Sequence, residues 1–176
     1  MMYPNPERAI GDDRGLAKNK CRGATFHVNT LAASGAAFLL AVLWFDLMFD
    51  VQTRKYVDGT LPAEVLASIS AYYRRVTIEA YPMNRLVALV MLLTIAAIVA
   101  EIVRGVHPWW IGWVSLALVG TGVASTLRRT VPNARRLGNA RDTADAQSAL
   151  ARAIYQDHLW SFARTCVVFG LQLIAR

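Results

Sequence analysis

Four long apolar segments dominate the pattern of hydrophobic and polar positions along the chain. Each is long enough to cross a hydrocarbon core about 30 Å thick, which takes about 20 residues of helix. No stretch alternates with a period of two over the length of a barrel strand, so the pattern favours helices over a β-barrel. The four predicted spans are Thr25–Phe49, Asn84–Val103, Trp109–Leu127 and Leu159–Ala175.

Two of these spans are predicted to continue beyond the bilayer. Thr60-Leu61-Pro62 is typical of a helix start, and the amphipathic helix that follows should be interrupted at Pro82, just before the second span. From Thr143 to Ala175 no residue breaks a helix, which predicts one helix about 50 Å long. Such a helix must project from the membrane.

These elements together predict an all-α fold: an integral membrane four-helix bundle with helical extensions beyond the bilayer. It is formed by residues 25–176 and preceded by a mobile polar N-terminal arm at residues 1–24. Small residues crowd the first span at Ala32–Ala37 and the third span around Gly120 and Gly122, which predicts close contact between helices at both places.

Composition and charge support a membrane location. The chain is 55% hydrophobic and carries a formal net charge of +7. Most basic residues flank the spans, where anionic headgroups are the simpler partner, and neither zinc-finger spacing nor a basic–aromatic pattern favours nucleic acid. We expect a multi-pass protein of the bacterial inner membrane, with the lipid bilayer as partner and no nucleic acid.

The last predicted span carries an arginine well inside its apolar run. An arginine in a spanning helix costs about 2.5–3.5 kcal/mol and normally faces the interior of a bundle. At helical spacing, Asp157, Ser161 and Arg164 share one stripe, and a neighbouring stripe carries His158, Thr165 and Gln172.

Antiparallel packing would bring the end of the first span beside the start of the fourth. Asp46 and Asp50 lie one turn apart near that end, and Asp46 is the partner that we predict for Arg164. This pair is either a structural ion pair that fixes helix register or part of a pocket for a small substrate. In a pocket, Arg164, His158 and Asp46 would be the catalytic residues. The substrate-binding residues would be Trp160, Ser161, Thr165, Asn133 and Trp44.

The opposite membrane face collects His27, Glu101 and His107, which are residue types that bind metals. They lie on three separate segments, so their spacing is not diagnostic, and we predict no metal. The chain also lacks a phosphate loop, a dinucleotide fingerprint and a haem-attachment motif, and we predict no cofactor.

One set of residues resembles a known family. The run Thr130-Val131-Pro132-Asn133, a charged linker, then Trp160 four residues before Arg164-Thr165 resembles the anthrone-oxygenase-like family, as does the Tyr81-Pro82 entry to the second span. The resemblance implies a small four-helix membrane protein. It also implies an oxygenase that acts on polyketide anthrones without an evident metal or flavin. The positions that carry over are Pro132, Asn133, Trp160, Arg164 and Thr165.

Three classes of function stay open on the sequence. The first is a cofactor-poor oxygenase, or a binder of a small apolar or aromatic substrate, with a cavity near Arg164. The second is a non-catalytic accessory or structural subunit, with a tightly filled bundle. The third is a transporter. Four spans are few for a transporter, so the chain would need to oligomerise. We also expect a homo-oligomer or a membrane partner protein.

Overall fold

The described part of the structure is almost entirely helical. The computed structural model describes residues 6–105 and 108–175, and the side chains of 28–82, 84–105 and 108–175. Within these ranges six α-helices are joined by turns, and no strand occurs. The helices are α1 (Pro6–Asp50), α2 (Ala63–Arg74), α3 (Met83–Arg104), α4 (Trp109–Ser125), α5 (Val131–Asn139) and α6 (Ala144–Ile174).

Three stretches are long and apolar enough to cross a membrane: Val28–Lys55, Asn84–Arg104 and Trp109–Asn139. They match the first three predicted spans, the last being prolonged because α4 passes through a π-helical turn, Thr126–Thr130, into α5. The uninterrupted helix predicted from Thr143 is confirmed by α6.

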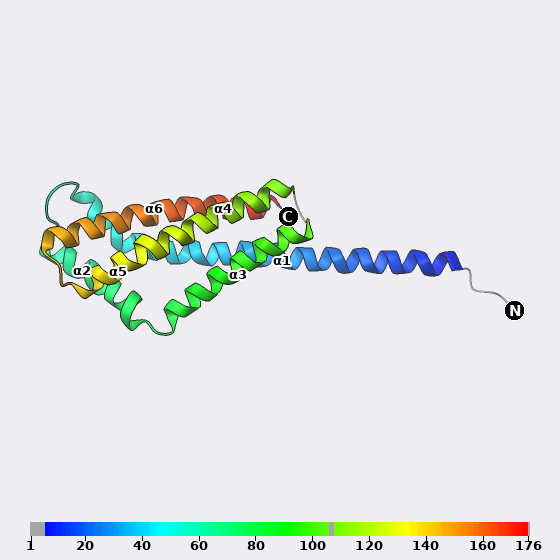
Figure 1. Cartoon of the computed structure of the whole chain (residues 1–176), viewed down its shortest axis with the longest axis horizontal. Coiled ribbons are helices and arrows are strands. Elements are labelled where there is room, and N and C mark those ends of the chain that lie inside the picture. The colour runs from blue at the N-terminus through cyan, green and yellow to red at the C-terminus, as the bar shows by residue number, and fades with distance from the viewer. Residues whose placement is uncertain (1–5, 106–107, 176) are drawn as a thin grey trace.

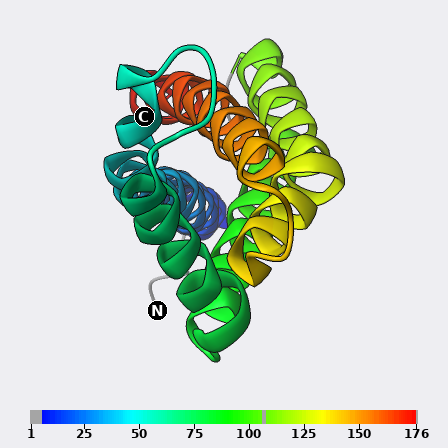
Figure 2. The same cartoon turned by 90° about the vertical axis from the view of Figure 1, so that its left-hand side faces the viewer.

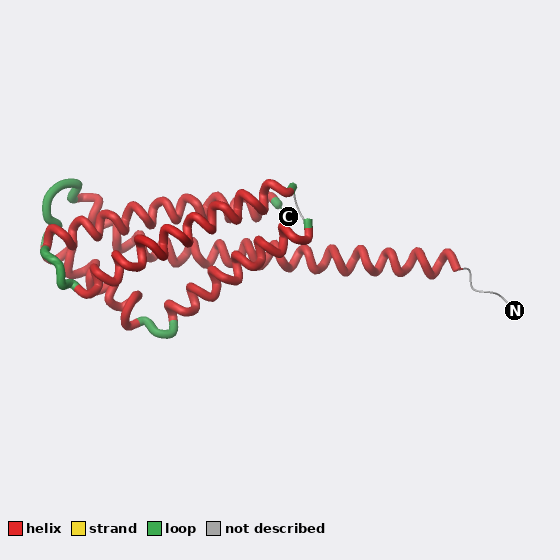
Figure 3. The backbone as a smooth tube through the Cα atoms, in the orientation of Figure 1, coloured by secondary structure: helices red, strands yellow, loops and turns green. Residues whose placement is uncertain are grey.

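The long helices lie side by side around a common centre (Figures 1 and 2). α1 packs against α3 and α6, and α4 packs against the same two helices. The N-terminal part of α1 continues alone beyond the others (Figure 3). Because α1 begins at Pro6, most of the segment for which the sequence predicts a mobile arm is helical.

A cap of short helices closes the other end. α2 and α5 pack on the first turns of α6 through a cluster of buried apolar side chains: Leu61, Leu66, Ile69, Tyr73, Ala134, Leu137, Ala151 and Ile154. Gly138 makes this contact close, since a Cβ atom there would lie 2.8 Å from the backbone nitrogen of Arg74. Arg152 ties the preceding loop down by donating to the carbonyl oxygens of Tyr56 and Gly59.

The chain leaves the cap where the sequence predicts a break. After α2 it forms a π-helical turn, Arg75–Glu79, and α3 begins directly after Pro82. The turn holds the start of α3 away from α1, and the two helices meet only further along (Figures 1 and 3).

Close helix contact occurs at one of the two predicted places. Gly35 of α1 packs directly against Thr94 of α3, beside the buried Ala32 and Ala36. The prediction for the second half of the third span is wrong, because a Cβ atom at Gly120 or Gly122 would meet nothing within 4 Å. The small residues there leave space instead of filling it.

Candidate functional site

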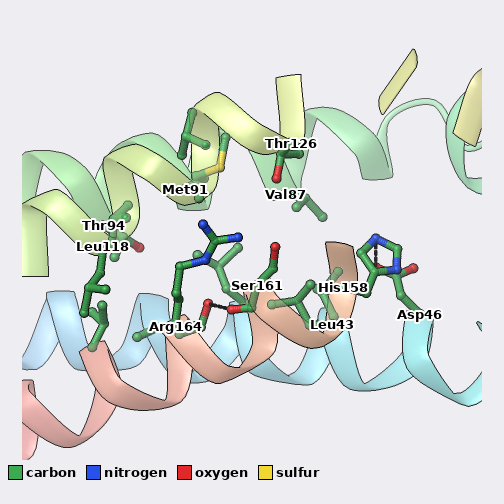
Figure 4. A pocket seen from close by; sticks show the side chains of 18 residues that line it. Leu43, Asp46, Val87, Met91, Thr94, Leu118, Thr126, His158, Ser161 and Arg164 are labelled. Carbon is green, nitrogen blue, oxygen red and sulfur yellow. Dashed lines mark hydrogen bonds and ion pairs between the residues drawn. The ribbon is translucent and has the colours of Figure 1, made fainter. Parts of the chain in front are cut away.

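A cavity of about 180 Å³ lies between α1, α3, α4 and α6. Most of its wall is aliphatic, including Leu43, Val87, Met91 and Leu118 (Figure 4). Gly122 lines it from α4, and the missing side chain there is one reason why the space exists. Its polar lining consists of Asp46, Thr94, Thr126, His158, Ser161, Arg164 and Thr165.

Arg164 is the cation of this cavity. Its guanidinium group extends from α6 toward α4, and its Nε donates to the carbonyl oxygen of Trp160 at 3.2 Å (Figure 4). No carboxylate of a described residue forms an ion pair with it, so the predicted Asp46–Arg164 pair is wrong. Asp46 instead accepts a hydrogen bond from Tyr72 of the cap. The sequence does not show that α2 folds back onto α1 to make this contact.

His158 stands between two carboxylates at the end of the cavity. Its Nδ1 lies 2.6 Å from Oδ2 of Asp50, and its Nε2 lies 4.0 Å from Oδ2 of Asp46. A ring nitrogen so close to a carboxylate carries the proton, so Nδ1 donates to Asp50, and Nε2 is the acceptor on the side of Asp46 whenever the ring is neutral. Asp50 thereby fixes the tautomer and orientation of His158.

Two adjacent tyrosines of α2 complete this network. Tyr73 donates its hydroxyl to Asp50 and Tyr72 donates to Asp46, both at 2.6 Å. Burial, and then the neighbouring carboxylates, raise the pKa of Tyr72 and Tyr73 far above the ordinary value. Both phenols therefore stay protonated and act as donors, and Asp50, which is fully buried, keeps two partners.

A second cavity of about 360 Å³ adjoins the first between α1, the cap and α3. Both are lined by Asp46 and His158, together with Val42, Val87 and Thr126. The tyrosine–carboxylate network thus stands at the junction of the two spaces.

The predicted site residues divide into two groups. The structure brings Arg164, His158, Asp46, Ser161 and Thr165 to the central cavity. Three others line neither cavity. Trp160 is 66% exposed on α6, Trp44 packs on Phe162 with ring centroids 6.2 Å apart, and Asn133 is half-buried on α5.

Asp157 also lies apart from the cavities. It accepts from Thr130 at 3.4 Å and forms an ion pair with Arg129 at 3.5 Å, so it fastens α6 to the turn before α5.

Sequence reasoning missed the residues that orient the histidine. Asp50 could be read as interfacial, and Tyr72 and Tyr73 as apolar positions of an amphipathic helix. The available signal was the pair of aspartates one turn apart, since buried carboxylates need donors. Paired tyrosines on the next helix are suitable donors.

The metal question falls partly outside the described residues, because His107 and the side chain of His27 are not described. Within the described ranges no group of three or more His, Cys, Asp or Glu residues is arranged so that it could hold a metal ion. No protein-family model matches the chain, and neither a curated protein nor a solved structure matches it. The function must therefore be inferred from the geometry of the site.

Proposed function

We propose that this is a multi-pass membrane protein of the anthrone-oxygenase type, which binds a small aromatic, weakly acidic molecule in the central cavity and oxidises it with O₂ without a cofactor. In this proposal α6 supplies the fourth span of a four-helix bundle. Its outward side chains Val167, Leu173 and Ile174 are exposed and apolar, as a lipid-facing surface requires, while Arg164 turns inward. A bacterial inner membrane is the expected location.

The observation that carries the proposal is the unpaired guanidinium group in an apolar cavity. A cation in a medium of low dielectric constant requires a countercharge. Because no described carboxylate supplies it, a bound enolate or phenolate oxygen would satisfy Arg164. The hydroxyl groups of Ser161 and Thr165 lie beside it on the same cavity wall.

The polar groups suit proton removal followed by stabilisation of the anion. The unprotonated Nε2 of His158 would take the acidic C–H proton of an anthrone, with Asp50 holding the ring. Arg164 would hold the enolate oxygen, since a fixed cation in a dry site stabilises developing charge strongly. The enolate carbon then binds O₂ and gains a proton to give a hydroperoxide, which loses water. Anthrone and O₂ thus yield anthraquinone and water, and the substrate supplies all the electrons.

The dimensions allow such a ligand. An apolar cavity of about 150 Å³ takes benzene, so the central cavity accommodates one ring with its oxygen. The adjoining cavity of about 360 Å³ offers room for a larger ring system. An accessory subunit with a filled interior and a neutralised arginine is less consistent with this cavity.

The first test is ligand binding by the purified protein in lipid nanodiscs, with 1-naphthol and naphthalene as probes. Arg164→Gln should weaken naphthol binding by about 10–100-fold, because a charged hydrogen bond is lost. It should leave naphthalene binding nearly unchanged. Gly122→Leu fills the cavity and should abolish binding of both probes, whereas Gly120→Leu, on the exposed side of the same helix, should not.

Turnover is tested separately with anthrone. Wild type should consume one O₂ for each anthraquinone formed, and His158→Gln should reduce this rate by about 100-fold or more with little change in binding. If Gly122→Leu still bound both probes, the central cavity would not be the binding site. If the wild type bound the probes but did not oxidise anthrone, the protein would bind aromatic ligands without being an oxygenase.

A further inference from the structure

A second buried polar cluster lies at the opposite end of the long helices from His158. Glu101 of α3 is 2% exposed, and Gln172 of α6 and Ser115 of α4 are fully buried. Gln172 donates through Nε2 to the hydroxyl oxygen of Ser115 at 3.4 Å, and the same amide group is the polar neighbour of the Glu101 carboxyl. Asn29 of α1 joins them by donating to the carbonyl oxygen of Ala175, one turn beyond Gln172.

The unsatisfied atoms of this cluster are all oxygens. Both carboxyl oxygens of Glu101 lack a hydrogen-bond partner, as do Oδ1 of Asn29 and Oε1 of Gln172. No ion pair reaches Glu101 from a described residue. Buried acceptors without donors are costly, since each loses its hydration without compensation. Four such oxygens on three helices need a hydrogen donor or a cation.

We propose that this cluster is a monovalent cation site for sodium, coordinated by Glu101 with the side-chain oxygens of Gln172, Asn29 and Ser115. Oxygen ligands without nitrogen or sulfur suit a hard cation. One carboxylate among neutral oxygens balances a single positive charge, whereas a divalent ion would leave a net charge buried.

The structure also provides room and access. Glu101 lines a cavity of about 60 Å³, whereas a water needs only about 10–15 Å³ by the same measure. There is therefore room for an ion and a water beside Glu101, which is the one proposed ligand that lines this cavity. The cavity extends to Gly105, Pro108 and Trp109 beside the connection between α3 and α4, and a cation would approach Glu101 from this end.

Thermal unfolding of the full chain in nanodiscs tests the site. The melting temperature should be roughly 5 °C higher in saturating sodium chloride than in N-methylglucamine chloride of equal ionic strength. Glu101→Gln should abolish this difference, and Ser115→Ala should reduce it. Glu64→Gln, which changes an exposed carboxylate of α2, should retain it in full.

Binding of radiolabelled sodium by a scintillation assay provides a second readout, which does not depend on stability. Saturable binding that Glu101→Gln abolishes is the expected result. No saturable binding, or equal binding by wild type and Glu101→Gln, would overturn the proposal and leave Glu101 as a neutral, protonated carboxyl. Because none of these four ligands lines the central cavity that Arg164 enters, neither result depends on the aromatic ligand.

Discussion

At the scale of single residues, the arrangement around Asp50 determines what His158 can do. A buried carboxylate is tolerated when donors surround it, and here one donor is Tyr73 and the other is the histidine ring. The tyrosine satisfies one oxygen of Asp50 and leaves the other to hold the ring. Tyr73 therefore supplies a hydrogen-bond donor that the apolar side chain expected from the helix pattern alone would lack.

Tyr73→Phe removes a donor from the buried Asp50 and should destabilise the protein by about 1–3 kcal/mol, because the carboxylate keeps a single partner. The midpoint of thermal unfolding in detergent measures this. Tyr155→Phe is the matched control, since Tyr155 is half-buried and makes no hydrogen bond in the described part of the chain. Equal midpoints for the two variants would show that Asp50 does not depend on the phenol.

The protonated phenol of Tyr73 also predicts that the folded protein loses stability at alkaline pH. The pKa of this phenol is raised in the folded protein by burial, whereas an unfolded tyrosine ionises near pH 10. The stability contributed by the protonated phenol is therefore complete below about pH 10 and decreases as the pH rises above it. Each such tyrosine makes the loss steeper by about 1.4 kcal/mol per pH unit, so Tyr73→Phe should flatten the decline. Parallel curves for variant and wild type would contradict this.

At the scale of elements, the cap explains which parts of the site the sequence could predict. The start of α6 after Thr143, the break at Pro82 and the single long α6 follow from local signals and are confirmed, whereas α1 begins at Pro6, well before the predicted start of the first span. The partner of Asp46 does not follow from local signals, because it depends on how α2 folds back onto α1. The cavity wall at Gly122 was likewise misread, since a glycine either permits contact or leaves space, and only the packing decides.

Gly138→Ala should weaken the contact between α5 and α2. The added Cβ would lie 2.8 Å from the backbone nitrogen of Arg74, which cannot move without displacing α2. We expect a loss of about 1–3 kcal/mol by overpacking, measured as a lower unfolding midpoint. Gly120→Ala, whose Cβ meets nothing within 4 Å, should instead gain up to about 1 kcal/mol from helix propensity. If both variants were equally stable, α5 would not pack tightly on α2.

At the scale of the whole molecule, the two ends of the long helices differ in chemistry. One end holds the tyrosine–carboxylate network under the cap, and the other holds Glu101 with the neutral side-chain oxygens that surround it. Between them lies the apolar cavity that Arg164 enters from α6. This division requires α6 to lie at the depth of the three apolar stretches, although α6 is not itself among the stretches that are long and apolar enough to cross a membrane.

Whether α6 crosses the membrane can be tested with its own cysteine. Cys166 is an exposed free thiol on α6, and Ala149 is exposed on the same helix about 25 Å nearer the cap. In intact membranes a charged maleimide should label Ala149→Cys, made in a background in which Cys21 and Cys166 are serine. It should leave Cys166 unlabelled in the Cys21→Ser protein, because a thiol facing lipid is neither hydrated nor ionised. Solubilisation in mild detergent followed by denaturation should expose Cys166 to the reagent. Rapid labelling of Cys166 in intact membranes would place this half of α6 in water and leave three spans, with the cavity at the membrane surface.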